Sequence, residues 1–275
     1  MTDLHFTKMH GLGNDFLVAA PPTPGWPDAD TVRRLADRRT GVGFDQLLLV
    51  ERPRNAGSHA AYRIFNADGS TAGQCGNGAR CIVRWLAVHR GLAGTIVLDS
   101  PAGTLSGRDL DDGDVEVDMG APRFAPADIP LRASAESATY TRHVDGREVR
   151  FAALSMGNPH AVIEIDSVAT APVGILGPAL EHHPDFPERV NVGFMQVVSP
   201  GEIRLRVHER GVGETRACGT GACAAAVTGL RAGRLSGNVA VALPGGTLAV
   251  RWAGPGHPVW MSGEAVLVYE GHLRL

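Results

Sequence analysis

The sequence predicts an α/β protein (α+β in its mix of sheet and helix) made of two homologous domains related by a pseudo-twofold axis. Short apolar or alternating runs bounded by glycine and proline dominate the chain, and such runs are typical of strands. The motif Cys-Gly-x-Gly-Ala occurs twice, each time directly before a run with helical periodicity. We therefore expect one motif in each domain and an active site in the cleft between the domains.

Three short segments recur in the same order and at nearly the same separation along the chain. The matched pairs are 13–16 with 157–160, 42–46 with 192–196, and 75–79 with 218–222. One such match could arise by chance, but three in register indicate an internal repeat. The repeat is the main reason for expecting two domains of one fold.

The individual elements follow from local patterns. Apolar stripes predict helices from Ala79 to near Gly91 and from Ala222 to near Gly233, with a third helix over 30–39. The polar, proline-containing segment 123–147 is expected to hold the connection between the halves. The expected strands are 47–51, 61–66, 95–100, 115–119, 160–166, 203–208, 239–243, 248–252 and 265–270.

Composition excludes several classes of protein. With 44% hydrophobic and 20% charged residues and a formal charge of −3, the chain is typical of a globular protein and lacks the basic field of a nucleic-acid binder. We find no apolar run long enough for a membrane span and no signal-peptide pattern, so we expect a cytoplasmic protein without a membrane partner. Lys8 is the only lysine and stands beside no phosphate loop, which argues against pyridoxal chemistry.

The four cysteines fall into two pairs, Cys75 with Cys81 and Cys218 with Cys223. Their spacings and the lack of an accompanying histidine pair do not favour zinc, so no metal is expected. Structural disulfides are disfavoured in a cytosolic chain. Cys81 and Cys223 fall inside the expected helices, where a small buried side chain suffices.

Cys75 and Cys218 instead stand at expected helix N-termini. There the backbone amides carry partial positive charge, glycine allows an anion to approach closely, and the pKa of a thiol is expected to fall. Two such thiols can act as general base and general acid on opposite faces of one carbon and invert it. Amides of the two helix N-termini could stabilise the carbanion.

Four segments carry a resemblance to a known family. They are 8–16, 66–80, 156–160 and 209–221, and together they resemble the signature motifs of the diaminopimelate epimerase family over essentially the whole chain. The resemblance implies that each domain is a sheet barrel around a central helix and that the last strand returns to the first domain. The implied domains are residues 1–119 with 265–275, and residues 120–264.

The resemblance also implies an activity. It implies epimerisation of LL- to meso-diaminopimelate without cofactor or metal, in lysine and peptidoglycan-precursor synthesis, by a homodimer acting on a small-molecule substrate. Cys75 and Cys218 would be the acid–base pair, with His160 and Glu209 supporting thiol ionisation and the substrate ammonium. The implied substrate-binding residues are Asn14, Gln46, Asn66, Gly76, Asn77, Asn158, Asn191, Glu209, Arg210, Gly219 and Thr220.

Each of these residues also has a simpler interpretation. Asn14 and Asn158 follow glycine and could be turn residues. Glu209 and Arg210 could form an exposed charge pair of little energetic value. Gln46, Asn66 and Asn191 could be solvated strand ends, His160 a satisfied structural histidine, and Lys8 part of a solvated strand edge.

Three rival functions remain open from the sequence. A proline or hydroxyproline racemase would share the two-cysteine logic, but such relatives tend to have Cys-Gly-His where this chain has Cys75-Gly76-Asn77. A phenazine-type isomerase of similar fold would not need both cysteines. A non-catalytic binding protein or thiol sensor could use Cys75 and Cys218 as a reversible disulfide.

Overall fold

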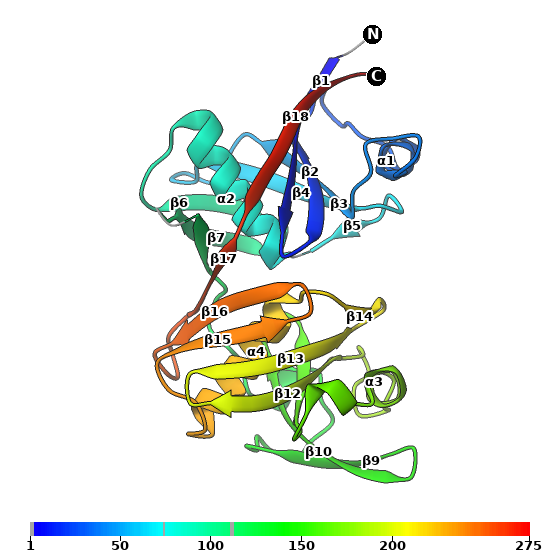
Figure 1. Cartoon of the computed structure of the whole chain (residues 1–275), viewed down its shortest axis with the longest axis vertical. Helices are drawn as coiled ribbons and strands as arrows, with labels where there is room; N and C mark the ends of the chain where they lie inside the picture. Colours follow the sequence, from blue (N-terminus) through cyan, green and yellow to red (C-terminus); the bar gives the residue numbers. More distant parts are fainter. Residues whose placement is uncertain (1–2, 74, 111–112) are drawn as a thin grey trace. The chain divides into compact units, whose positions relative to one another are not determined.

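A computed structural model describes residues 3–73, 75–110 and 113–275. The chain forms two compact units, drawn in Figure 1: the N-unit, Met1–Val117 with Ser262–Leu275, and the C-unit, Asp118–Met261. The segment 123–147 therefore lies inside the C-unit and does not connect the halves, contrary to expectation. This polar segment contains a strand, Tyr140–Val144, whose Tyr140 and Val144 side chains are buried.

The N-unit is a curved sheet with two helices. β1 pairs antiparallel with β18 and β2, β2 runs parallel to β3, β3 pairs with β4, and β4 continues to β6, β7 and β8. Helix α2 packs against β1, β2, β3 and β7, so the sheet wraps around it (Figure 1). The elements are β1 Asp3–Gly11, β2 Asn14–Ala19, α1 Ala29–Ala36, β3 Gln46–Glu51, β4 Ala60–Asn66, β5 Thr71–Ala72, α2 Gly76–Arg90, β6 Ile96–Ser100, β7 Gly103–Asp109, β8 Asp114–Asp118 and β18 Val266–Arg274.

The C-unit repeats this plan. β10 pairs antiparallel with β9 and β11, β11 runs parallel to β12, β12 pairs with β13, and β13 continues to β15 and β16. Helix α4 contacts strands from β10 to β16 and is enclosed by the sheet. The elements are η1 Pro126–Asp128, β9 Tyr140–Val144, β10 Arg147–Ser155, β11 Pro159–Glu164, η2 Val168–Thr170, α3 Val173–Glu181, β12 Asn191–Ser199, β13 Glu202–Glu209, β14 Gly213–Thr215, α4 Gly219–Arg231, β15 Asn238–Leu243 and β16 Gly246–Trp252. The boundary between the units falls within β17, Val259–Glu264. The expected α/β fold, a sheet around a central helix, is confirmed in each unit.

Strand register shows which residues of the two units are equivalent. Gln46 begins β3 opposite Phe16 of β2, and Asn191 begins β12 opposite His160 of β11. Gln46 is therefore equivalent to Asn191, and the match between 42–46 and 192–196 is wrong, because the second segment lies within a strand and the first precedes one. The ends of β4 and β13 make Asn66 the counterpart of Glu209 in the same way.

Both central helices follow the two cysteine motifs as the sequence predicts, and each begins three residues before its predicted apolar stripe. Cys75 is the N-cap of α2, which stops at Gly91, a left-handed C-cap with φ of 62° that favours glycine. Cys218 is the N-cap of α4, which ends at Arg231, two residues before Gly233 with φ of 68°. Helix α1 is shorter than expected, because the Asp37 side chain accepts the backbone amides of Arg39 and Thr40 and turns the chain.

The buried residues of each unit explain why its central helix is placed as it is. Helix α4 consists largely of alanine and glycine, and all but three of its residues are buried. A Cβ atom at Gly229 would lie 2.3 Å from Leu235 Cδ1, so the chain after the helix packs directly on the helix backbone. Within the described part of the chain, no helix has the length and apolar character needed to cross a membrane.

Candidate active site

Cys75 lies at the first turn of α2, with its side chain held against the helix. Its sulfur accepts a hydrogen bond from the backbone N–H of Gly78 at 3.3 Å. Asn14 Oδ1, at the start of β2, lies 3.8 Å from the sulfur and can accept the thiol proton. The expected neighbours Asn14 and Cys75 are thus brought together within the N-unit.

A directed chain of hydrogen bonds fixes the side-chain amides beside Cys75. Arg80, which is fully buried, donates from Nη2 to Asn77 Oδ1 at 2.9 Å. Asn77 Nδ2 then donates to Asn14 Oδ1 at 3.3 Å, and Asn14 Nδ2 donates to Asp45 Oδ2 at 3.0 Å. Because a guanidinium only donates and a carboxylate only accepts, the two ends of this chain determine which way both amides face. Asn14 therefore presents its carbonyl oxygen to Cys75.

Asp45 is held in place by a charged cluster. Asp15 and Asp45 each accept the backbone N–H of the other at 3.1 Å, and Arg38 Nη2 donates to both carboxylates. Although burial alone would raise it, hydrogen bonds from Arg38 and Lys8 hold the pKa of Asp15 well below its usual range. The cluster thus ties the start of β2 to the loop before β3.

Lys8 belongs to this cluster and is not part of a solvated strand edge. Its ammonium group donates to the Asp15 carboxylate and to the Gly43 carbonyl, and the residue is buried. Because a lysine side chain has a long apolar stem, both a buried and a solvent-exposed position on a strand are compatible with the sequence. The buried position depends on the ion pair with Asp15, and no local sequence pattern indicates that pair.

Gln46 and Asn66 face each other across β3 and β4. Gln46 Nε2 donates to Asn66 Oδ1 at 2.9 Å, and Asn66 Nδ2 donates to Ser70 Oγ at 2.9 Å. Gln46 Oε1 is buried and has no hydrogen-bond partner among the described residues. An acceptor left without a donor in this way is suited to an ammonium group of a ligand.

Cys218 is more enclosed than Cys75, with 4% of its surface exposed. Its sulfur lies 3.7 Å from the Thr220 hydroxyl. Burial, reinforced by the Glu209 carboxylate, raises the pKa of the Cys218 thiol well above its usual range, although Gly221 and Thr220 act in the opposite direction. The expected lowering of the pKa at this helix N-terminus is therefore wrong for Cys218, because burial and the Glu209 carboxylate outweigh the hydrogen bonds from Gly221 and Thr220.

Asn158 occupies the place in the C-unit that Asn14 occupies in the N-unit, but its amide faces the other way. Its Nδ2 donates to Thr220 Oγ1 at 3.3 Å, while its Oδ1 lies 3.0 Å from His160 Nε2. Burial, together with the Arg210 charge, lowers the pKa of His160 to about 3, so the ring is neutral near pH 7. A neutral imidazole with Nε2 protonated can donate to the Asn158 carbonyl, which makes His160 an orienting group in this structure.

The remaining residues expected in the C-unit site lie around the turn from β13 to β14. Asn191 is buried, and both ends of its amide bind backbone: Nδ2 donates to the Pro159 carbonyl at 2.9 Å, and Oδ1 accepts the Arg210 N–H at 3.0 Å. Glu209 accepts from Thr215 Oγ1 at 2.5 Å, and Arg210 Nη1 donates to the Glu188 carbonyl at 2.9 Å. Glu209 and Arg210 thus have separate partners and are not a simple surface pair.

Sequence reasoning missed the residue that anchors this turn. Glu181, at the end of α3, is 3% exposed and binds His208 Nε2 at 2.8 Å and the Gly211 N–H at 2.8 Å. The hydrogen bond from His208 helps keep the pKa of Glu181 below its usual value despite the opposing effect of burial. The signal for this contact is tertiary, since Glu181 and His208 lie 27 residues apart in the sequence and no local pattern links them.

Gly76 and Gly219 are the first residues of α2 and α4, where the backbone amides have no partner within the helix. Such amides, together with the positive end of the helix dipole, are suited to holding a carboxylate. Among the described residues, no group of three or more His, Cys, Asp or Glu side chains is arranged to hold a metal ion. The thiols of Cys75 and Cys218 are suited to acid–base chemistry, and the amides at Gly76 and Gly219 are suited to recognition of a carboxylate.

The low pKa of His160 predicts a measurable pH dependence of stability. The unfolded chain binds a proton at His160 below about pH 6.5, but the folded protein does so only near pH 3, so stability is lost as the pH falls between these values. By pH 5 the loss attributable to this group is about 2 kcal/mol. Urea unfolding of the wild type and of His160→Gln at pH 7 and pH 5 checks this. An equal loss in both proteins would show that other groups carry it.

Comparison with solved structures defines the class of fold to which this site belongs. The chain superimposes on a hydroxyproline epimerase from Agrobacterium vitis with a TM-score of 0.71 and 17% identity, covering 99% of this chain and 94% of that one. A Bacillus anthracis phenazine biosynthesis protein of the PhzF family matches with a TM-score of 0.68 and 14% identity, covering 100% of each chain. The protein thus has the two-unit epimerase and isomerase fold.

Sequence comparison is more specific. The profile of the diaminopimelate epimerase family matches residues 6–125 and 152–268. The chain is 53% identical to the diaminopimelate epimerases of Stutzerimonas stutzeri and Pseudomonas aeruginosa over 274 residues, which is 99% of each sequence. The chain belongs to the diaminopimelate epimerase family.

Proposed function

We propose that this protein is an isomerase that converts LL-diaminopimelate to meso-diaminopimelate without pyridoxal phosphate, in lysine and peptidoglycan-precursor synthesis. Membership of the family at 53% identity over nearly the whole chain supports the reaction. The observation that carries the mechanism is the equivalence of Cys75 and Cys218, each the N-cap of the central helix of its unit. Epimerisation by two bases requires that both sulfur atoms reach the same α-carbon.

The proposed roles of the two thiols follow from their surroundings. Because burial and Glu209 keep Cys218 protonated, Cys218 is the proton donor when the Cys75 thiolate removes the α-proton. The pair of electrons left on the α-carbon is delocalised into the substrate carboxylate. Cys218 then delivers its proton to the opposite face and becomes the thiolate, and the reverse reaction exchanges these roles.

The two helix N-termini would stabilise the charge that develops on the carboxylate. Amides at Gly76 and Asn77 on α2, and at Gly219 and Thr220 on α4, are fixed by the helices before the substrate arrives. Dipoles already in position cost little reorganisation in the transition state, which is why such groups commonly supply a large part of a rate enhancement. Lowering the barrier in this way replaces the electron sink that pyridoxal would provide.

The distal amino-acid end of the substrate needs groups of both charges. The unpartnered Gln46 Oε1 can accept from an ammonium group, with Asn66 beside it. The Glu209 carboxylate suits the ammonium and the Arg210 guanidinium suits the carboxylate. We assign Asn14 and Asn158 to substrate contact. His160 would hold Asn158 in place, and Asn191 would hold Arg210 in place.

We further propose that the enzyme is a cytoplasmic homodimer. Strand β18 supports the dimer, because Val268, Tyr269 and Glu270 are three consecutive exposed residues on a strand. A strand in a folded unit usually buries alternate side chains, so exposure on both faces indicates a surface suited to a second chain. Sedimentation of the wild type and of Tyr269→Ala tests the dimer: the variant should shift toward monomer.

Proton NMR in heavy water tests the reaction and the substrate together. Reduced protein with LL-diaminopimelate should lose the α-proton signal and form the meso isomer, while proline and hydroxyproline should keep their α-protons. Exchange with the proline compounds alone would keep the two-thiol mechanism and reassign the substrate. Exchange with none of them, with reduced thiols confirmed, would leave the fold without this function.

Asp45 offers a test of how Asn14 is positioned. Asp45→Ala removes the acceptor of Asn14 Nδ2 and lets the amide rotate, so we expect kcat/KM to fall roughly 10- to 100-fold. Asp45→Asn keeps one carbonyl acceptor and should recover part of the loss. Steady-state kinetics check both variants, with the exposed Asp30→Ala as a matched control and thermal melting to separate positioning from stability. If Asp45→Asn is as impaired as Asp45→Ala, the orientation argument fails.

A further inference from the structure

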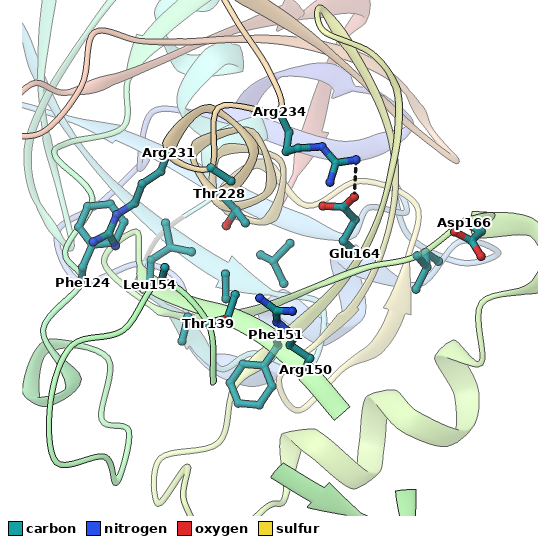
Figure 2. Close-up of a pocket in the computed structure, with 16 residues that line it drawn as sticks. Phe124, Thr139, Arg150, Phe151, Leu154, Glu164, Asp166, Thr228, Arg231 and Arg234 are labelled. Carbon is teal, nitrogen blue, oxygen red and sulfur yellow. Dashed lines mark ion pairs between the residues drawn. The ribbon is translucent and has the colours of Figure 1, made fainter. Parts of the chain in front are cut away.

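A cavity of about 590 Å³ lies within the C-unit, beneath the last turn of α4 (Figure 2). Its walls come from β10, β11, the end of α4 and the loop before β9. Thr228, which lines it, stands roughly 15 Å along the helix axis from Cys218, because an α-helix rises about 1.5 Å per residue. The cavity is therefore distinct from the cysteine site, and its volume is typical of a small-molecule pocket.

Small and apolar side chains create this space. Ala152 on β10 pairs with Val162 on β11, and both line the cavity together with Leu154. Ala232, directly after α4, also lines the cavity. A larger side chain at position 152 would fill the gap between strand and helix. The surface formed by Ala152, Leu154 and Val162 is suited to contact with the apolar body of a ligand.

One polar group inside the cavity has no partner. Thr228 Oγ1 is buried and makes no hydrogen bond with any described residue. Figure 2 shows the Thr228 side chain on α4 facing the strands across the cavity. Buried hydroxyls are nearly always hydrogen-bonded in folded proteins. This hydroxyl therefore indicates that a polar atom of a ligand or a water completes the site.

The three arginine side chains that line the cavity differ in the partners that they bind. Arg234 pairs with Glu164 at 2.9 Å, and Arg231 binds Glu136 and lies 4.0 Å from the centre of the Phe124 ring. Arg150 is exposed at the rim and takes part in none of the ion pairs found within the described residues. Its guanidinium can therefore receive an anion without first breaking another contact.

We propose that this cavity binds a small amphipathic carboxylate. Its apolar body lies on Ala152, Leu154 and Val162, its carboxylate binds Arg150, and a polar atom along its body bonds the Thr228 hydroxyl. The assignment rests on the shape of the cavity, the unpartnered hydroxyl and the unpaired arginine. It does not depend on the proposed epimerase reaction, because none of these residues belongs to the cysteine site.

Calorimetric titration with three related probes tests each part of the proposal. 6-Hydroxy-2-naphthoate carries both polar groups, 2-naphthoate lacks the hydroxyl, and 2-naphthol lacks the carboxylate. We expect saturable binding that is tightest for the first probe. Arg150→Gln should weaken the two carboxylates by about tenfold and leave 2-naphthol unchanged. Thr228→Val should remove the advantage of the hydroxylated probe.

Two further variants complete the test. Ala152→Leu should abolish binding by filling the cavity, while Arg204→Gln, an exposed arginine of the C-unit outside the cavity, should bind as the wild type does. Circular dichroism reports whether Ala152→Leu is folded; if it is not, the exposed Arg150→Gln decides. The proposal is overturned if no probe saturates, if 2-naphthol binds as tightly as the carboxylates, or if Arg150→Gln has no effect.

Discussion

Replacing either Cys75 or Cys218 with alanine is expected to reduce epimerisation by at least about 10³-fold, because each replacement removes the acid–base group that we propose for one face of the α-carbon. The two losses should be similar, since one remaining thiol cannot both remove and return the proton on opposite faces. Each variant can still exchange the α-proton on the face that it retains. NMR in heavy water measures both, as formation of the other isomer and as loss of the α-proton signal.

Cys81 and Cys223 provide matched controls in the same two helices. Both are fully buried inside their helices, beyond the N-cap positions that Cys75 and Cys218 occupy, so both serve as packing residues in this comparison. Cys81→Ala and Cys223→Ala should turn over nearly as the wild type does while losing roughly 1–2 kcal/mol of unfolding free energy. Retained epimerisation in both Cys75→Ala and Cys218→Ala would refute the two-thiol mechanism.

Glu209→Gln is expected to reduce kcat by roughly 10²-fold and to change the titration of one cysteine only. The carboxylate is, after burial, the largest cause of the raised pKa of Cys218, so removing its charge should lower that pKa. Alkylation of Cys218 by iodoacetamide should then begin at a lower pH than in the wild type. Mass spectrometry of the labelled peptides follows Cys75 and Cys218 separately.

The same hairpin supplies the control for this change. Glu214→Gln makes the identical substitution at a residue that pairs with Arg206 on the strand surface. It should leave both kcat and the alkylation profile of Cys218 unchanged. An unshifted profile in Glu209→Gln would mean that burial alone holds the Cys218 proton and that Glu209 acts only on substrate.

Glu209 also gives the two cysteine sites of this repeated fold different electrostatic surroundings. Its counterpart in the N-unit is Asn66, a neutral amide, and the equivalent asparagines Asn14 and Asn158 present opposite ends of their amides toward the two cysteine sites. Repetition supplies two thiols at matching helix termini. The divergence of a few polar neighbours would then allow one thiol to act as base while the other carries a proton.

Local sequence patterns were sufficient for much of the fold. The strands with alternating or continuous apolar residues and the helices that follow Cys75 and Cys218 lie where the patterns indicate. Among the described residues, strands β1, β2, β5, β7, β9, β10, β12, β14 and β17 and helix α3 were not predicted, and β1 and α3 illustrate the physical reason. Strand β1 buries polar residues such as Lys8, which bind partners from other segments. Helix α3 packs closely on β13, since a Cβ atom added at Gly177 would lie 2.7 Å from the Cβ atom of His208.

The candidate site was predictable only as far as residue types and motifs allow. Cys75 and Cys218 stand out because glycines at a helix start have a known chemical use. Asp45, Arg80 and Glu181 do not stand out, because their importance comes from where distant segments place them. The pKa of Cys218 was misjudged since desolvation depends on the whole packed unit and not on the motif.

The return of β18 to β1 has a consequence for how the protein is made. The C-unit is one continuous stretch of chain, whereas the N-unit needs Ser262–Leu275 to complete its sheet. On the ribosome, the half that is synthesised second can therefore finish folding first, the reverse of the usual order. Until the last strand emerges, the edge of β1 is open to pairing with other chains. Nascent-chain chaperones that bind during this interval would prevent such pairing.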